Sequence, residues 1–340
     1  MIKELPPYGI LSRVYDDFLS EDPMGDWQGT KSDWRETYDF LRDKIKDNIW
    51  PMWDPESQNW IGNSKHRKEE ATRNELILMM EHFQKTNILD QQPAYLANIS
   101  SDYRKNHLWH FKIEDNVKYS PGNPRSRNFK DLDLVASIET GTNYICYNPW
   151  YNPEKFSIYF AGDQRRKIHG LFDFKKDSMR PRPYQTAALF GLNDFSHLMG
   201  AHSTHTGTHP SLISGHAIQG LLLSCMVLEF WLRNNELEKF DKNHDYIKSL
   251  AQYAVDFGDR RVFAGVHYPS DNIASWFVSL SIIPRTFRFA DQILEFAKFA
   301  IQDHSLVYRL IDNEYRNNAD LKSSVDLLDT VLPPSEHGIT

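Results

Sequence analysis

Three short segments of the sequence concentrate basic and histidine side chains. The first, KKDSMRPRPYQ at residues 175–185, contains Lys175, Arg180 and Arg182. Arg180 and Arg182 each precede a proline, and a residue in that position avoids helical backbone and favours extended backbone. An extended segment can direct a guanidinium inward, where its planar donors bind two oxygens of a phosphate at once. The alternative interpretation is a solvated run of charge.

The second segment, THPSLISGHAIQG at residues 208–220, has the composition of a helix start that could hold an anion. Ser214, Gly215 and His216 come directly before a long apolar run. The first backbone N–H groups of a helix lack an intrahelical acceptor and carry the positive end of the helix dipole, so small residues there let an anion approach. The alternative is a plain N-cap, in which Ser214 satisfies the first turn and His216 has no chemical role.

The third segment, GDRRVFAGVHYPSDN at residues 258–272, pairs a histidine with a carboxylate. Asp271 follows His267 by four residues, and Arg261 precedes His267 by six. A carboxylate that hydrogen-bonds an imidazole fixes its tautomer and stabilises its cationic form, as nucleophilic catalysis requires. Pro269 lies between the two residues, so regular helical pairing is not assumed. The alternative is a surface turn.

Further histidines lie in SHLMGAHSTHTGTHP, which overlaps the start of the second segment. The glycine, serine and threonine residues between them indicate a loop. No cysteine or carboxylate lies among these histidines to complete a tetrahedral zinc site. We therefore expect them to line a pocket rather than to bind zinc. They are His197, His202, His205 and His209.

Together, the order and spacing of the three segments resemble the signature of the type 2 phosphatidic acid phosphatase superfamily. That signature is Lys, six residues, Arg-Pro; then Ser-Gly-His; then Arg, five residues, His, three residues, Asp. Its members include bacterial class A acid phosphatases, membrane lipid phosphatases and vanadium-dependent haloperoxidases. Two positions depart from it: Ile213 stands where a proline is usual, and Arg260 where a serine is usual. The matching residues are Lys175, Arg182, Pro183, Ser214, Gly215, His216, Arg261, His267 and Asp271.

The resemblance implies a phosphate site. In that site Lys175, Arg182 and Arg261 bind the non-bridging oxygens of a phosphoryl group. Ser214 and the backbone N–H of Gly215 assist them. This agrees with the physics of phosphoryl transfer, which is catalysed mainly by positioning and by neutralising charge on the equatorial oxygens. Because three cations face one dianion, we expect the phosphatase to need no metal ion or other cofactor.

The resemblance also implies a covalent mechanism. In it His267 attacks phosphorus to give a phosphohistidine, while Asp271 orients the ring. His216 protonates the leaving oxygen and later activates water. The ordinary pKa of histidine, about 6.5, suits both duties at mildly acidic to neutral pH. The expected function is a soluble, metal-independent phosphatase that hydrolyses a phosphomonoester or a diphosphate.

Two other functions remain open from the sequence. The same pocket can hold vanadate, a phosphate analogue, on the nitrogen of His267, which is the haloperoxidase arrangement. The strings MRPRPY and GVHYPSD look more like the phosphatase branch, and MRPRPY resembles the class A acid phosphatases. Those secreted enzymes are shorter, however, so the haloperoxidase remains an alternative. The third possibility is a non-catalytic phosphate-binding module.

Helical periodicity dominates the elements that must position these segments, and strand alternation is rare. The resemblance implies an all-α helical bundle, to which this chain adds an N-terminal helical region. We expect residues 1–150 to form a helical and loop cap, residues 151–320 the catalytic helical core, and residues 321–340 a C-terminal tail whose final stretch is frayed. The periodicity predicts helices at residues 31–49, 76–83, 215–233, 247–262, 272–283 and 287–303.

Composition excludes several classes of protein. The 40% hydrophobic and 25% charged residues are typical of a soluble globular protein, and a net charge of -7 argues against a general nucleic-acid binder. Cys146 and Cys225 are too few for a disulfide framework. No export signal is visible, and the most apolar window, residues 217–232, is shorter than the roughly 20 residues that span a bilayer. We expect a cytoplasmic protein that acts on a small phosphorylated molecule without nucleic acid or membrane, with homo-oligomer formation left open.

Overall fold

The computed structural model describes part of the 340-residue chain. The described residues are 31–49, 52–54, 59–61, 65–84, 171–195, 210–233, 235, 237–263 and 265–334. Most of the predicted cap at residues 1–150 lies outside them. The predictions for Cys146 and for the histidine-rich loop also fall outside the described residues, at His197, His202, His205 and His209.

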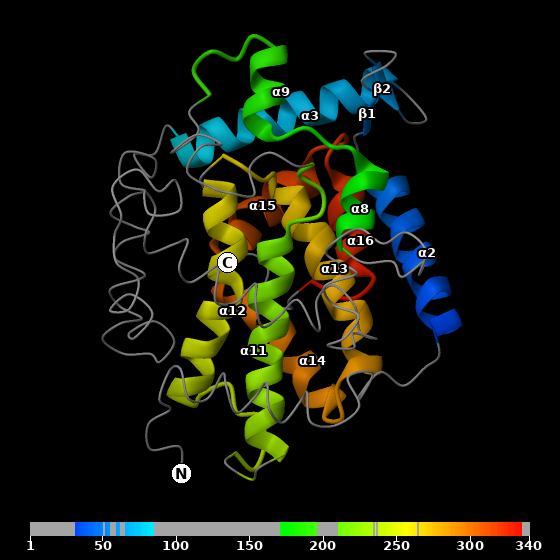
Figure 1. Cartoon of the computed structure of the whole chain (residues 1–340). Coiled ribbons are helices and arrows are strands. Elements are labelled where there is room, and N and C mark those ends of the chain that lie inside the picture. Colours follow the sequence, from blue (N-terminus) through cyan, green and yellow to red (C-terminus); the bar gives the residue numbers. More distant parts are fainter. Residues whose placement is uncertain are drawn as a thin grey trace, which may run out of the picture.

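The described chain is all-α, as predicted, apart from one short antiparallel sheet. Strands β1 (Met52–Asp54) and β2 (Asn59–Ile61) pair with Trp53 opposite Trp60. The longer helices are α2 (Lys31–Asn48), α3 (Lys65–Met79), α11 (Gly215–Arg233), α12 (Asp245–Phe263), α13 (Pro269–Thr286), α14 (Ala290–Phe299) and α15 (Leu306–Asn317). The shorter ones are α8 (Leu171–Ser178), α9 (Pro183–Leu189), α16 (Lys322–Asp329) and the π-helical turns η1 (Met80–Gln84) and η4 (Ala300–His304). Helices α12, α13 and α14 all pack against α11, which runs through the bundle (Figure 1).

Helix α11 is the most apolar element of the bundle. By length and composition it could cross a membrane, but its apolar window is buried inside the bundle. A core helix and a membrane span pass the same test of length and composition, so this helix alone is weak evidence for a span. Its predicted bounds, 215–233, are those observed.

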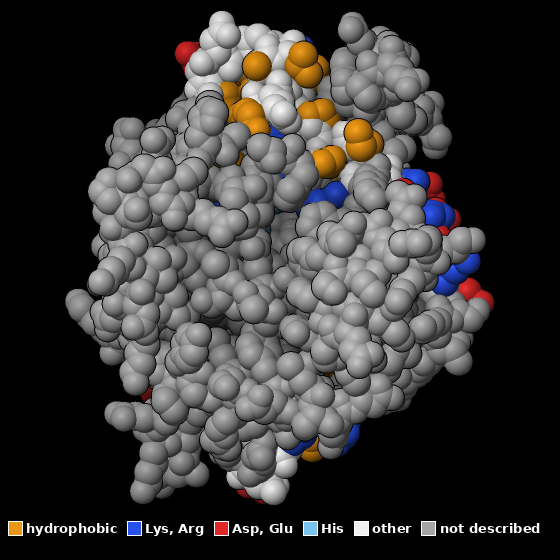
Figure 2. Space-filling model, in the orientation of Figure 1, with side chains coloured by type: hydrophobic (Ala, Val, Ile, Leu, Met, Phe, Trp, Pro, Cys, Tyr) orange, Lys and Arg blue, Asp and Glu red, His pale blue; other side chains and the backbone are white. Residues whose placement is uncertain are grey.

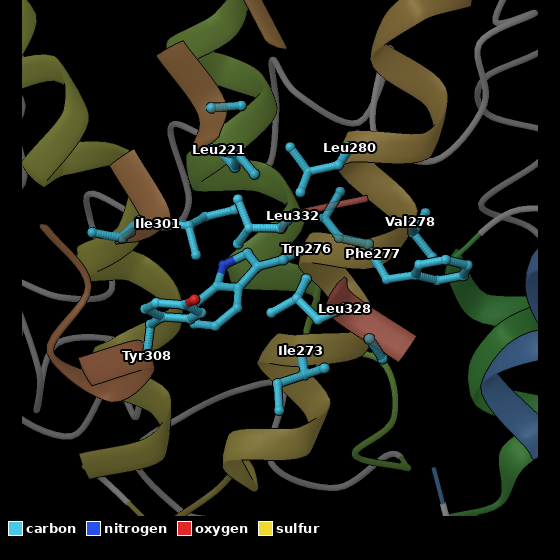
Figure 3. Close-up of a cluster of buried hydrophobic side chains, with 14 of the residues drawn as sticks. Leu221, Ile273, Trp276, Phe277, Val278, Leu280, Ile301, Tyr308, Leu328 and Leu332 are labelled. Carbon is cyan, nitrogen blue, oxygen red and sulfur yellow. The ribbon is translucent and has the colours of Figure 1, made fainter. Parts of the chain in front are cut away.

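The C-terminal helices close the core. Trp276 of α13 packs edge-on against Tyr308 of α15, with ring centroids 6.2 Å apart and planes at 68°. Leu328 of α16 and Ile301 of η4 lie beside this pair (Figure 3). Each fully buried aliphatic side chain contributes about 1.5 to 3 kcal/mol to folding. The C-terminal segment is therefore part of the folded unit.

This packing corrects the predicted tail at residues 321–340. Residues 322–329 instead form α16, and Val325, Leu328 and Leu332 are buried. The spacing of these three residues places them on one face of a helix. The terminal proline pair suggested fraying, but Pro333 and Pro334 follow the helix and do not interrupt it. Residues 335–340 lie outside the described residues.

The surface at the α9 end of the bundle differs in character from the surface along α2. Apolar side chains gather over the α9 end of the molecule, with Lys and Arg side chains directly below them in the view (Figure 2). Met179 and Leu189 at this end are 46% and 59% exposed. Along α2, by contrast, charges of both signs alternate, and Arg42 pairs with Asp39 at 2.8 Å. The α9 end is also the end at which the basic segments meet.

Helices α11 and α12 approach each other closely at Gly258. A Cβ atom on Gly258 would lie 2.7 Å from the Cβ of Ala217 and 3.0 Å from the Nδ2 of Asn272. Neither contact is with the flexible end of a long side chain, so relief would require the helices to move apart. The close approach lets α12 bring Arg261 next to the start of α11.

We expect Gly258→Ala to lower the free energy of unfolding by about 1 to 2 kcal/mol, because overpacking outweighs the gain in helix propensity. Urea denaturation measures this difference. In an Ala217→Gly background the same change should cost less, since the nearest atom is gone. A Gly258→Ala variant as stable as the parent protein would contradict the close packing.

Candidate active site

The first basic segment enters the site as an extended connector between α8 and α9. Helix α8 ends at Ser178, and Arg182, with φ -69° and ψ 153°, is the N-cap of α9. Pro183 takes the first helical position, where its missing N–H is not needed. Arg180 and Arg182 are buried, with 0% and 1% of their surface exposed. The prediction of extended backbone is confirmed for Arg182, and a solvated run of charge is excluded for both arginines.

The second segment begins α11 with Ser214 as its N-cap. The Oγ of Ser214 accepts a hydrogen bond from the N–H of Ala217 at 3.4 Å. Its own N–H donates to the carbonyl oxygen of Asp271 at 3.4 Å. The starts of α11 and α13 therefore lie together, and Gly215 stands at the first position of α11. The capping interpretation of Ser214 holds, and it leaves the anion-binding interpretation open.

His216 faces the basic cluster rather than solvent. It is 4% exposed, and its Nε2 lies 2.8 Å from the Nη2 of Arg261, which comes from α12. An arginine can only donate, so the Nε2 of His216 must be the acceptor of this hydrogen bond. His216 therefore contacts Arg261 inside the cluster, and its chemical role stays a prediction.

The third segment forms the start of α13. Tyr268 is the N-cap and Pro269 the first helical residue, so Asp271 stands at the third position, where the helix dipole favours a carboxylate. The Oδ2 of Asp271 lies 2.9 Å from the Nδ1 of His267 and accepts the N–H of Tyr268 at 3.0 Å. All of these residues are buried, which excludes a surface turn.

Arg182 joins the first segment to the third. Its Nη1 lies 2.8 Å from the Nε2 of His267 and donates to the carbonyl oxygen of Val266 at 2.7 Å. Because arginine donates, the Nε2 of His267 is an acceptor, and its Nδ1 therefore carries the proton that binds Asp271. His267 is thus held as the neutral tautomer whose Nε2 lone pair points into the cation cluster.

Lys175 contacts the backbone of the second segment. Its Nζ donates to the carbonyl oxygens of Pro210, Ser211 and Ile213 at 2.9, 3.1 and 2.6 Å. These bonds use all the donors of an ammonium group. Lys175 therefore holds the chain that leads to Ser214 and brings positive charge close to Arg182. Direct binding of a phosphoryl oxygen would require Lys175 to release one of the carbonyls.

The sequence matches the family model of the PAP2 superfamily over residues 169–294. This chain contains a PAP2-superfamily domain. The matched span runs from the start of α8 into α14 and includes every site residue that the sequence predicts. No curated protein and no solved structure matches the chain. The superfamily resemblance is confirmed, and the finer resemblance to class A acid phosphatases stays a prediction.

The site of this PAP2 domain includes an arginine that the family signature does not name. The Nη1 of Arg180 donates to the Oδ1 of Asp271 at 2.6 Å and to the Oγ of Ser270 at 2.8 Å. Its guanidinium also lies 3.7 Å from the ring centre of Tyr268. Arg180 and Arg182 both stood out in the sequence as basic residues that precede a proline. The pattern did not show that Arg180 contacts Asp271 whereas Arg182 contacts His267.

Two further residues reach the PAP2 domain from outside the matched span. The carboxylate of Glu75, from α3, accepts from Arg180 at 2.8 Å, and it accepts the hydroxyl of Tyr315, from α15, at 2.6 Å. Neither residue was a candidate from the sequence. Glu75 is fully buried, although it stands in a helix rich in charged residues. The only sign of its burial in the sequence was its position next to the apolar residue Leu76.

Burial and mutual repulsion weaken the hold of Lys175, Arg182 and His267 on their protons. Burial, followed by the charge of Arg182, lowers the pKa of both Lys175 and His267 well below the usual values. Burial also lowers the pKa of Arg182 to about 10, with Arg261 adding to the effect and Asp271 opposing it. For Asp271, burial raises the pKa, but Arg180 and His267 outweigh it and hold the pKa below its usual range. At neutral pH, His267 is neutral and Asp271 is ionised.

The lowered pKa of His267 predicts a loss of stability in acid. Below about pH 6.5, the unfolded chain binds a proton at this histidine before the folded chain does, so the free energy of unfolding falls as the pH falls. We expect His267→Gln to make the decline between pH 7 and pH 5 shallower. Urea denaturation at several pH values in phosphate-free buffer measures the slope. Equal slopes in the two proteins would contradict the assignment.

Proposed function

We propose that this protein is a phosphatase that hydrolyses a phosphomonoester or a diphosphate through a phosphohistidine. The match to the PAP2 family model supports a phosphatase-type family. The observation that carries the finer proposal is the acceptor nitrogen of His267, oriented by Asp271 and 2.8 Å from a donor of Arg182. A nucleophile, its orienting carboxylate and a cation for the attacked group thus meet in one buried site.

Substrate binding uses the donors that now contact the two imidazoles. Phosphoryl oxygens that accept hydrogen bonds from Arg182 and Arg261 take the places of His267 and His216. Both Nε2 atoms then face the bound phosphoryl group. Lys175 adds charge, and Ser214 with the N–H of Gly215 lies at the start of α11, where an anion is stabilised. The cations supply most of the charge stabilisation that phosphoryl transfer needs.

Catalysis proceeds in two displacements. In the first, His216 enters as the imidazolium, after Nε2 has left Arg261 and bound a proton. The Nε2 of His267 forms a bond to phosphorus, the bond from phosphorus to the leaving oxygen breaks, and the now neutral His216 has given that oxygen its proton. In the second, His216 takes a proton from water, the water oxygen bonds to phosphorus, and the phosphorus–nitrogen bond breaks. Asp271 stabilises the positive charge that His267 carries while phosphorylated. The products are an alcohol, or a phosphate, and inorganic phosphate.

The acceptor nitrogen of His267 also fits vanadate, which makes a haloperoxidase the second candidate. An oxyanion of vanadium would bind this nitrogen while Lys175, Arg182 and Arg261 neutralise its oxygens. Among the residues that the structure describes, no group of three or more His, Cys, Asp and Glu side chains could hold a bare metal ion. Bound vanadate would supply peroxide activation and halide oxidation. The tautomer and the cations would be the same in both enzymes.

The two candidates differ in a simple assay. Release of p-nitrophenol from p-nitrophenyl phosphate that resists EDTA and is inhibited by vanadate supports the phosphatase. Bromination of a dye that requires both vanadate and peroxide supports the haloperoxidase. A phosphate-binding module would show neither activity but would be stabilised by phosphate. For substrate and location, we propose a small phosphorylated molecule in the cytoplasm.

We expect His267→Ala to abolish phosphate release while the protein stays folded, because the change removes the nitrogen that forms the phosphorus–nitrogen bond. The assay is release of p-nitrophenol, with circular dichroism to check folding. His244→Ala removes an imidazole near the start of α12, at the other end of that helix from Arg261, and should leave activity unchanged. Undiminished turnover in His267→Ala would rule out this nucleophile.

Arg182→Ala should lower kcat by roughly 100- to 1000-fold, or about 2.7 to 4 kcal/mol of transition-state stabilisation, as does the loss of a preorganised oxyanion donor. Steady-state kinetics with p-nitrophenyl phosphate measures the loss. Arg309→Ala, which removes an exposed arginine of α15, is the control. A loss below about tenfold would contradict the placement of Arg182 at the reacting phosphate.

A further inference from the structure

We propose that Glu75 and Tyr315 are positioning residues that orient His267 through Arg180 and Asp271. This inference rests on the proposed phosphatase function, in which His267 is the nucleophile. Neither residue touches the proposed phosphate site. They belong to α3 and α15, outside the span matched by the PAP2 family model. The inference gives these flanking helices a part in catalysis.

The carboxylate of Glu75 is fully occupied by donors from three other elements. Its Oε2 accepts from the Nη2 of Arg180 at 2.8 Å and from the Oγ of Ser270 at 2.9 Å. Its Oε1 accepts from the N–H of Ser270 at 2.8 Å and from the hydroxyl of Tyr315 at 2.6 Å. Burial and the charge of Glu75 raise the pKa of Tyr315 well above its usual value, so its hydroxyl remains a donor at neutral pH.

Three successive contacts connect Glu75 to the nucleophile. Arg180 is held between two carboxylates, those of Glu75 and Asp271. Asp271 in turn is hydrogen-bonded to the Nδ1 of His267. All four side chains are at most 2% exposed, so water does not screen the charges or replace a lost partner. A change at Glu75 must therefore be accommodated along this chain.

Glu75 also fixes the backbone that carries Asp271. It accepts the N–H of Ser270, the second residue of α13, and so caps that helix from another helix. Asp271 caps the same helix from within, by accepting the N–H of Tyr268. The two carboxylates thus hold one helix start at the point where His267 leaves it. The arrangement controls both the direction of Asp271 and its distance to the imidazole.

Glu75→Gln keeps the shape of the side chain and removes its charge. Of the four donors that now point at Glu75, at least one will meet an amide NH₂, which is itself a donor. Arg180 then has one anionic partner instead of two and is drawn toward Asp271, whose bond to His267 weakens. We expect kcat to fall by roughly 10- to 100-fold, the effect of a misplaced catalytic group. KM and the Kd for inorganic phosphate should change by less than about threefold, because the phosphate ligands are untouched.

A spectroscopic readout tests the positioning without any activity. A histidine Nδ1–H that is hydrogen-bonded to a carboxylate gives a proton signal far downfield in the NMR spectrum. The signal that disappears in His267→Asn belongs to His267. In Glu75→Gln we expect this signal to move or to be lost. Glu70→Gln, which makes the same change at an exposed site on α3, should leave the signal and the kinetics as they are.

Tyr315→Phe is the second test, because it removes one hydrogen bond to Glu75 and leaves every charge in place. It should shift the same signal and lower kcat by a smaller factor than Glu75→Gln. If Glu75→Gln does not fold, Tyr315→Phe decides the question by the same two measurements. A wild-type signal and wild-type kcat in a folded variant would overturn the proposal. So would parallel losses of kcat and phosphate affinity with an unmoved signal, since they indicate a general disturbance.

The failure of the proposed function is separable from the failure of this inference. If the parent protein releases no phosphate from p-nitrophenyl phosphate, the phosphatase proposal is in doubt, while the NMR signal of His267 still reports whether Glu75 controls its hydrogen bond. A moved signal supports the positioning, and an unmoved signal in both variants overturns it. Binding of inorganic phosphate, measured by calorimetry, completes the comparison.

Discussion

The burial of several positive charges beside two imidazoles is the constraint on which the rest of this structure depends. Lys175, Arg182 and Arg261 are each at most 3% exposed. Burial of a charge without full compensation costs several kcal/mol, and the lowered pKa values of Lys175 and Arg182 have this origin. The apolar packing of the bundle must offset that cost. The repulsion between the buried cations is unfavourable by itself, and a bound anion would relieve it. Preorganised electrostatic catalysis uses charges that are held in place in this way.

Two helix starts give this charge cluster its geometry. The Oγ of Ser275 lies 2.9 and 2.7 Å from the carbonyl oxygens of Ser214 and Asp271, which share its single proton, so α11 and α13 begin side by side. Their dipoles add positive potential at the place where the arginines converge. Helix α12 can then deliver Arg261 only because Gly258 lets it approach α11. The packing of α11, α12 and α13 therefore determines where the side chains of the site lie.

Sequence reasoning could locate the groups that share a local pattern. The prolines after Arg180 and Arg182 fix extended backbone whatever the surroundings, and the small residues before the apolar run mark the start of α11. Glu75 could not be found in this way, because its partner Ser270 lies 195 positions away. Periodicity shows which face of a helix is apolar, but not which charge on that face is buried with a partner. The same limit hid α16, where the weight given to two terminal prolines outweighed the spacing of the apolar residues.

The contacts divide the chain into a span that presents the reactive groups and flanking helices that hold them. Every residue proposed to touch the phosphate lies between 169 and 294, in the PAP2 domain. Helix α3 supplies Glu75, α15 supplies Tyr315, and α2 contacts α8, where the hydroxyl of Tyr38 donates to Asp177 at 3.1 Å. Without the carboxylate of Glu75, Arg180 would keep one carboxylate in a fully buried place, and the loss of one partner of a buried pair costs about 3 to 5 kcal/mol. The matched span is thus not self-sufficient in this chain: Arg180 is paired with a carboxylate from α3, and that carboxylate is held by a hydroxyl from α15.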